Sequence, residues 1–306
     1  MCKKKFLNFL PKSRLLENVS LKNFTTFRIG GVSKWLAFPK SFNEVKRIIS
    51  HCIKFNVSYF CLGEGSNTLF CDSGFDGVVI SLKKLNKIKR KGNGISACAG
   101  VTLGEVISFA KTNSLSGLEW ATGIPASVGG AVVNNAGCFG YDISQAVNQV
   151  YALKAGRVVR FRADQCDFSY RHSTFSKGFI VLKVDFKLNR ESKEVIEKNI
   201  REFITKRINL QPRGFSAGSV YKKVGSVSAG KIIDELGLKG TRVGDAVVSP
   251  KHANFIINLG NATSADVLRL MQIIEDKVKA KRNIVLTREI IIVGENNENN
   301  RGLSQS

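Results

Sequence analysis

The sequence lacks the features that mark several common classes of protein. No two of its seven cysteines form a C-x-x-C pair, so we expect no zinc or other metal site, and their odd number argues against a disulfide framework. Free cysteines are typical of a reducing cytoplasm. No apolar run approaches the ~20 residues that a membrane span needs, and the lysine-flanked segment 6–10 is too short and too polar for a signal peptide. We therefore expect a cytoplasmic protein that does not insert into membranes.

Acidic residues are scarce compared with basic ones. The chain has 24 Asp and Glu against 47 Lys and Arg, which gives a formal net charge of +23. Such an excess can indicate nucleic-acid binding, but the basic residues are scattered along the chain and no RNA- or DNA-binding motif is present. We expect no nucleic-acid partner, and instead expect the positive potential to attract anionic small molecules.

The apolar pattern predicts alternating helices and strands, with no internal repeat, in a chain long enough for two or three domains. Ser41 and Glu44 form a predicted capping box for one helix, and Thr102 and Glu105 form another. Further helices are expected at 192–208, 228–236 and 264–281. Strands are expected at 59–62, 78–80, 95–99, 255–258 and 289–293, with a hairpin at 150–162, a half-buried strand at 180–188 and a lysine-rich loop at 82–94.

Two glycine-rich stretches stand out. The first, Gly63 to Asn67, follows an apolar run, as in turns whose main-chain N–H groups hold a pyrophosphate. It matches neither the G-x-G-x-x-G dinucleotide fingerprint nor the P-loop, because no third glycine and no Gly-Lys-Ser/Thr follows. The second, residues 121–140, contains five glycines and Pro125, and its pattern indicates neither helix nor strand. Such a chain can lie very close to a flat or anionic ligand.

These stretches, together with Val128-Gly129-Gly130-Ala131, resemble the FAD-binding module of the vanillyl-alcohol oxidase and p-cresol methylhydroxylase type. Within that superfamily the chain resembles the UDP-N-acetylenolpyruvoylglucosamine reductase (MurB) family from about residue 25 to 294. It resembles the shorter second type, because no tyrosine-bearing lid insertion is present between Lys239 and Phe255.

The resemblance implies a mixed α/β (α+β) fold with a two-lobed FAD-binding module and a C-terminal α+β substrate-binding domain. The expected divisions are an N-terminal arm at 1–24, an FAD-binding domain at 25–190 with lobes of about 25–83 and 84–190, a substrate-binding domain at 191–294 and a disordered tail at 295–306.

The same resemblance implies an enzyme of peptidoglycan precursor synthesis. Its reaction would be the NADPH-dependent reduction of UDP-N-acetylglucosamine enolpyruvate to UDP-N-acetylmuramate through noncovalent FAD, and we expect a monomer. One alternative is another FAD-dependent oxidase or dehydrogenase of the superfamily, acting on a hydroxy acid or sugar lactone. The other is a non-enzymatic basic scaffold.

The family's catalytic residues match Arg171, Ser219 and Glu289. A guanidinium at Arg171 would bind the substrate carboxylate and stabilise developing negative charge. The Ser219 hydroxyl would donate a proton to carbon, and Glu289 would act opposite Arg171. Without the resemblance, Arg171 would be interpreted as a surface charge, Ser219 as a turn residue and Glu289 as a solvated residue at the start of a strand.

The resemblance also implies binding residues. Those expected to hold FAD are Arg28, Gly63, Glu64, Gly65, Ser66, Asn67, Gly123, Ile124, Gly129 and Gly130. Those expected to bind the UDP-sugar are Tyr170, Arg207, Lys222, Lys223 and His252, of which His252 is equally consistent with a structural histidine.

The chain departs from the family pattern at two places. Lys223-Val224 stands where the family has Asn-Pro, and Ala126 replaces a common glycine after Pro125. The change at Lys223-Val224 puts the local loop shape and one family substrate contact in question. The change at Ala126 matters only if the backbone there has a positive φ.

Overall fold

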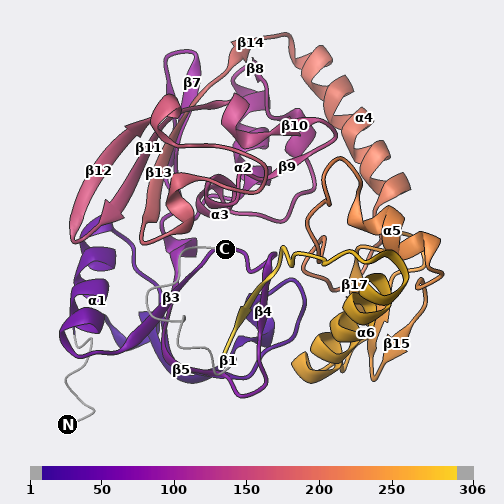
Figure 1. Cartoon of the computed structure of the whole chain (residues 1–306). Helices are drawn as coiled ribbons and strands as arrows, with labels where there is room; N and C mark the ends of the chain where they lie inside the picture. Colours follow the sequence, from indigo (N-terminus) through magenta and orange to yellow (C-terminus); the bar gives the residue numbers. More distant parts are fainter. Residues whose placement is uncertain (1–8, 295–306) are drawn as a thin grey trace.

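The computed structural model describes residues 9–294, which form two lobes and a C-terminal domain (Figure 1). A cleft lies where these three parts meet. The expected tail at 295–306 lies outside the described residues. No helix within 9–294 combines the length and the apolar character that crossing a bilayer would require.

The first lobe is built on a four-stranded sheet of order β1-β2-β5-β3, in which β1 and β2 are antiparallel and the other pairs are parallel. Its strands are β1 (Leu15–Ser20), β2 (Val32–Ala37), β3 (Ser58–Leu62) and β5 (Phe75–Ser81), with helix α1 (Phe42–Lys54) packed beside β3. The predicted irregular arm is therefore wrong for residues 15–20. These residues form an edge strand that pairs with β2, and only a partner distant in sequence reveals it.

The helix α1 begins as predicted, but only one of the two hydrogen bonds of the expected capping box forms. The Ser41 hydroxyl accepts a hydrogen bond from the Glu44 N–H at 3.2 Å. The Glu44 carboxylate does not return to Ser41. It accepts instead from the Lys40 N–H at 2.7 Å and pairs with Arg14 at 2.5 Å. By contrast, the predicted capping box of Thr102 and Glu105 at α2 is complete.

The second lobe carries a five-stranded antiparallel sheet of order β12-β11-β13-β7-β6. Its strands are β6 (Ile88–Lys91), β7 (Gly94–Cys98), β11 (Val147–Lys154), β12 (Arg157–Arg162) and β13 (Ile180–Lys187). The predicted hairpin is confirmed as β11 and β12. The lysine-rich segment is not wholly a loop, because it contains β6. The strand β13 is not half-buried but buried on both faces over most of its length, since it lies at the centre of the sheet beneath α3.

Helices and short ladders complete this lobe. The helices are α2 (Leu103–Thr112) and α3 (Val128–Val133), and the ladders pair β8 (Leu115–Ser116) with β14 (Asn189–Arg190) and β9 (Gly137–Cys138) with β10 (Tyr141–Asp142). Short 3-10 turns are η2 (Lys12–Arg14), η3 (Leu21–Phe24), η4 (Leu82–Lys84), η5 (Glu119–Ala121), η6 (Ile143–Gln145), η7 (Ala163–Gln165) and η8 (Thr174–Ser176).

The long helix α4 (Lys193–Leu210) runs from the second lobe toward the C-terminal domain (Figure 1). It packs against α2 and η5, and its Ile200 and Phe203 side chains join the core of the second lobe. Its packing thus places α4 with the FAD-binding lobes, although the predicted division at residue 190 assigns it to the substrate-binding domain.

The C-terminal domain packs α5 (Ala229–Glu235) and α6 (Ser264–Arg282) on a three-stranded sheet of β15 (Arg242–Val243), β16 (Ala246–Val248) and β17 (Ile256–Asn258). Its last strand, β18 (Ile291–Val293), leaves this sheet and pairs in parallel with β4 (Thr68–Phe70) of the first lobe. Asp72 strengthens the junction, because its carboxylate accepts hydrogen bonds from the Ser264 N–H and hydroxyl at the start of α6. The domain is therefore fastened to the first lobe.

Candidate active site

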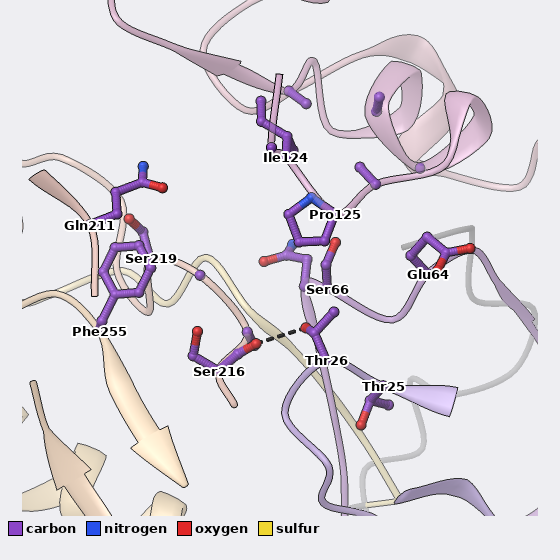
Figure 2. A pocket seen from close by; sticks show the side chains of 18 of the residues that line it. Thr25, Thr26, Glu64, Ser66, Ile124, Pro125, Gln211, Ser216, Ser219 and Phe255 are labelled. Carbon is purple, nitrogen blue, oxygen red and sulfur yellow. Dashed lines mark hydrogen bonds between the residues drawn. The ribbon is translucent and has the colours of Figure 1, made fainter. Parts of the chain in front are cut away.

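A cavity of about 740 Å³ lies where the two lobes and the C-terminal domain meet. Figure 2 shows Ile124 and Pro125 facing it from the second lobe, Thr26 and Ser66 from the first, and Ser219 from the C-terminal domain. The Thr26 hydroxyl donates to the Ser216 carbonyl at 2.7 Å, which ties the first lobe to the C-terminal wall. The size is that of a site for a large organic ligand.

The turn that follows β3 contributes part of the wall through Glu64, Ser66 and Asn67. Gly63 and Gly65 lie in this turn but not on the wall. Gly65 has a φ of +65°, and a Cβ there would lie 2.5 Å from the Phe24 carbonyl oxygen. Glycine is thus required because φ is positive and the neighbouring chain at Phe24 passes behind the turn.

The central stretch contains a helix that its composition concealed. The short helix α3 is buried at every residue, and the Ser127 hydroxyl caps it by accepting from the Gly130 N–H at 3.3 Å. The Gly129 N–H donates to the Ala99 carbonyl at 2.9 Å, so this group is committed to the protein and cannot serve a ligand. Of the three glycines of this stretch predicted to bind FAD, Gly123 and Gly130 line the cavity and Gly129 does not.

The turn before α3 brings Gly123 and Ile124 to the wall. Gly123 has a φ of +79°, and a Cβ there would lie 2.9 Å from Cδ of Arg207. Ala126 does not have a positive φ, so alanine is tolerated where the family commonly has glycine. Arg28 also lines the cavity, where its guanidinium donates to the Asn23 side chain at 3.0 Å.

Arg171 and Glu289 form an ion pair on the cavity wall. The Arg171 Nε lies 2.5 Å from the Glu289 Oε1 without hydrogen-bond geometry, and Nη1 donates to the Gly137 carbonyl at 3.1 Å. Arg171 has a φ of +54°, a left-handed conformation in the turn between β12 and β13. Burial raises the pKa of Glu289 above its usual range, and the positive charges of Arg171 and Lys222 only partly oppose this.

Backbone pairing holds Ser219 beside this ion pair. Ser219 forms an antiparallel bridge with Phe255, and the Glu289 N–H donates to the Val220 carbonyl at 2.7 Å. The Ser219 and Glu289 segments are therefore hydrogen-bonded neighbours. The structure brings Arg171, Ser219 and Glu289, which come from three distant parts of the sequence, onto one cavity.

The residues predicted to bind the sugar nucleotide are less uniformly placed. Arg207 lines the cavity, but its guanidinium donates to the Thr122 carbonyl at 2.8 Å, to the Gln211 side chain at 2.7 Å and to Cys138 Sγ at 3.1 Å. These contacts attach α4 to the turn at Gly123. Arg207 is thus largely occupied in supporting that turn.

The other four predicted binding residues lie off the main cavity wall. The Lys223 N–H donates to the Tyr170 hydroxyl at 3.3 Å, and the Lys223 ammonium lies 4.5 Å from the Tyr170 ring centroid. Lys222 faces a second, smaller cavity. His252 accepts from the Asn254 N–H at 3.2 Å, and burial lowers its pKa, as for a structural histidine.

Several wall residues had not been singled out from the sequence. They are Thr26, Asn134, Ser216, Phe215 and Phe255. Thr26 precedes the glycine pair at 30–31 and Asn134 follows α3, so proximity to the glycine-rich stretches was a usable signal. Phe215 and Phe255 had no such signal, because aromatic residues in loops and strands are normally interpreted as part of the hydrophobic core.

The donors on the wall fit FAD. Arg28, Lys83, Ser66 and Asn67 supply cationic and neutral donors suited to a diphosphate, while Ile124, Pro125 and Ala131 offer an apolar face suited to planar rings. Among residues 9–294 no group of three His, Cys, Asp or Glu side chains is placed to hold a metal ion.

Comparisons with known proteins agree with this geometry. Residues 33–162 match a family described as an FAD binding domain, and residues 211–293 match one described as the C-terminal domain of UDP-N-acetylenolpyruvoylglucosamine reductase. The chain is similar to proteins of that name from Clostridium novyi, with 40% identity over 97% of both chains, and from Clostridium tetani, with 40% identity over 97% of this chain and 99% of the relative.

Solved structures give the same result. A crystal structure of the Thermus caldophilus protein titled UDP-N-acetylenolpyruvylglucosamine reductase (MurB) superposes with a TM-score of 0.80 at 36% identity, over 90% of this chain and 98% of that one. A variant of Phl p 4, titled a glucose oxidase, superposes with a TM-score of 0.50 at 15% identity over 90% of this chain and 57% of that one. The second likeness shows the fold alone.

Proposed function

Because the chain belongs to the UDP-N-acetylenolpyruvoylglucosamine reductase family, we propose that Arg171, Ser219 and Glu289 are the residues with which it protonates its substrate. The activity is the NADPH-dependent reduction of UDP-N-acetylglucosamine enolpyruvate to UDP-N-acetylmuramate with FAD as cofactor, a step of peptidoglycan precursor synthesis. The observation that supports the assignment is the meeting of these three side chains on the cavity that the glycine-rich stretches also line.

When bound, FAD would supply hydride chemistry, passing a hydride from NADPH to the terminal vinyl carbon of the enolpyruvyl group. Negative charge then develops on the neighbouring carbon and its carboxylate. The Arg171 guanidinium binds this carboxylate and stabilises the charge, and the Glu289 carboxylate holds the guanidinium in position. The Ser219 hydroxyl donates the proton that completes the reduction at that carbon. One hydride and one proton are thus added across the double bond.

The residues that would hold FAD are the wall residues of the first lobe, the Gly123 turn and the start of α3. We propose that the link is noncovalent. The cysteine of the described wall is Cys138, whose thiol donates to the Trp120 carbonyl at 3.4 Å, and no histidine lines this cavity within residues 9–294. Precipitation with acid tests this, because yellow colour that stays in the pellet would contradict it.

Membership in the reductase family decides against the alternative of an oxidase or dehydrogenase acting on a hydroxy acid or lactone. We further propose a monomer that acts in the cytoplasm, where a reducing environment suits the six described free cysteines. Light scattering of the purified protein tests the first point, and fractionation of cells tests the second.

The Ser219→Ala variant tests the catalytic assignment. NADPH should still reduce the flavin at the parent rate, while reoxidation by substrate should slow by about 10²–10⁴-fold because the proton donor is lost. Stopped-flow absorbance of the flavin measures each half-reaction, and Ser226→Ala, in an exposed turn of the same domain, is the control. Equal slowing of both half-reactions would show that Ser219 has a binding or structural role.

A further inference from the structure

A second cavity of about 260 Å³ lies behind the Arg171–Glu289 ion pair. Four residues, Asn67, Asn134, Arg171 and Glu289, line both this cavity and the main one. The ion pair is therefore part of a partition, with the substrate side in front and a separate polar chamber behind. Lys222, which the resemblance assigned to the substrate, faces the chamber behind.

The backbone pairing explains why Lys222 lies there. Residues 220–222 run antiparallel to residues 287–289, because Tyr221 is paired with Arg288, the Lys222 N–H donates to the Thr287 carbonyl at 2.8 Å and the Glu289 N–H donates to Val220. In such a ladder Tyr221 and Arg288 project to one face, and Lys222 and Glu289 project to the other, on a diagonal of roughly 7–8 Å.

The contacts of the opposite face confirm this division. The Tyr221 hydroxyl donates to the Met271 carbonyl at 3.1 Å, and the Arg288 guanidinium donates to both carboxylate oxygens of Glu275, at 2.8 and 3.0 Å. Both partners belong to α6, so Tyr221 and Arg288 face that helix. Lys222 and Glu289 consequently face away from α6.

Lys222 is half-buried, and within residues 9–294 its ammonium has no hydrogen-bonded acceptor. The charged groups around Glu289 are Arg171 in the partition and Lys222, His172 and Arg288 on the second cavity. Arg288 is paired with Glu275, and His172 lies 3.6 Å from Asp167. Arg171 lies against Glu289 itself. Of the other three, Lys222 is thus the one that contacts no other carboxylate among the described residues.

We propose that Lys222 is a positioning residue that acts through Glu289: its charge, on the far side of the partition from the substrate, keeps the Glu289 carboxylate ionised so that it holds Arg171. The proposal rests on the catalytic assignment given above. The adjacent Lys223 is exposed and lies against Tyr170, outside both cavities, so the two lysines have different roles.

Substitution of Lys222 by methionine tests the proposal in the FAD-loaded enzyme. Without the lysine charge, the Glu289 carboxylate should accept a proton at higher pH. The acid limb of the pH profile for flavin reoxidation by substrate should therefore move upward by roughly 0.5–1 pH unit. Lys222→Arg should restore the parent profile, and Lys223→Met should leave the position of the limb unchanged.

A measurement independent of activity follows the carboxyl group itself. In protein labelled with ¹³C at the glutamate carboxyl, Glu289→Gln identifies the Glu289 resonance, and its titration should move upward in Lys222→Met but not in Lys223→Met. Thermal unfolding establishes that each variant is folded, and Lys222→Gln replaces Lys222→Met if the latter is not.

An unchanged Glu289 titration in Lys222→Met would overturn the proposal. So would weaker binding of the sugar nucleotide with an unchanged pH profile, because that result would make Lys222 a substrate ligand. Failure of the catalytic assignment is recognised separately, as reoxidation that stays fast in Arg171→Ala.

Discussion

The second lobe and the cleft each bury one carboxylate beside a basic side chain, but the pKa values of the two carboxylates move in opposite directions. The Asp185 side chain on β13 is 2% exposed, and the Glu289 side chain is 11% exposed. Burial raises the pKa of Asp185, but hydrogen bonds from Lys91 and Ser96, each 2.6 Å long, outweigh it and hold that pKa below its usual range.

Glu289 has less of this support, because Arg171 and Lys222 only partly offset the effect of its burial on the pKa. Its contact with Arg171 is close but is not a hydrogen bond at Nε, and the burial of Glu289 is compensated only in part. The balance between burial and the surrounding hydrogen bonds and charges therefore sets the direction of each pKa shift. Asp185 is placed to stabilise a sheet, whereas Glu289 is held in a less favourable setting beside Arg171 in the proposed catalytic site.

Glu289→Gln should produce the largest effect on activity in this comparison. An uncharged amide cannot form an ion pair with the Arg171 guanidinium, so reoxidation of the flavin by substrate should fall by about 10²–10³-fold, as for loss of one charge-stabilising group. Reduction by NADPH should stay near the parent rate. Stopped-flow measurement of both half-reactions checks this, with Asp185→Asn as the control that should keep both rates. A variant that reoxidises as fast as the parent would remove Glu289 from the mechanism.

Asp185→Asn should produce the largest effect on stability. It takes the charge from a buried acceptor that two side chains contact, and should lower the free energy of unfolding by roughly 1–3 kcal/mol. Denaturant unfolding measures the loss. The matched control is Asp164→Asn, because Asp164 pairs with Arg162 on an exposed surface where an ion pair contributes little. If both variants unfold at the same denaturant concentration, the Asp185 network is not stabilising.

The two carboxylates should also differ in how stability depends on pH, and this is the smallest effect. The pKa of Asp185 is lowered in the folded state, so its stabilisation is present above the unfolded pKa of about 3.9 and disappears as pH falls through the lower folded pKa. The pKa of Glu289 is raised, so stability is lost as pH rises from the unfolded pKa of about 4.3 through the higher folded pKa.

Two pH series of thermal unfolding check these signs. Glu289→Gln should be slightly more stable than the parent at neutral pH and equal to it in acid, by a margin smaller than the Asp185→Asn loss. The deficit of Asp185→Asn should narrow as the pH falls. A Glu289→Gln variant that is less stable at neutral pH would show that its pair with Arg171 stabilises the fold.

Local signals predicted much of the fold, and long-range pairing explains most of what they missed. The cap at Thr102 and the turn between β11 and β12 depend on neighbouring residues, so both were predicted correctly. The strand β1 was missed because its exposed, irregular pattern becomes a strand only beside β2. The helix α3 was missed because two glycines lower its propensity, and burial in the second lobe overrides that preference.

The candidate site was predicted through resemblance more than through pattern. Nothing local to Arg171 or Glu289 indicates that they meet across the cleft. The pattern also could not separate Lys222 from Lys223, because the direction of each side chain depends on the pairing of residues 220–222 with residues 287–289. The glycine at Gly65 has a positive φ, and a side chain there would also meet the carbonyl oxygen of Phe24, a contact between distant segments that the sequence pattern did not reveal.

The parallel pairing of β18 with β4 has a consequence for the order in which the protein folds during synthesis. Strand β4 is synthesised early, but Ile291, which pairs with Thr68, emerges more than two hundred residues later. Closing so long a loop is slow and entropically costly, so this contact should form among the last steps of folding. Glu289 lies two residues before that pairing, and the Asn67 side chain donates to its carbonyl at 3.2 Å. A ribosome-bound chain can therefore form both lobes before Glu289 joins the proposed catalytic site, so that site is completed only when the last strand pairs.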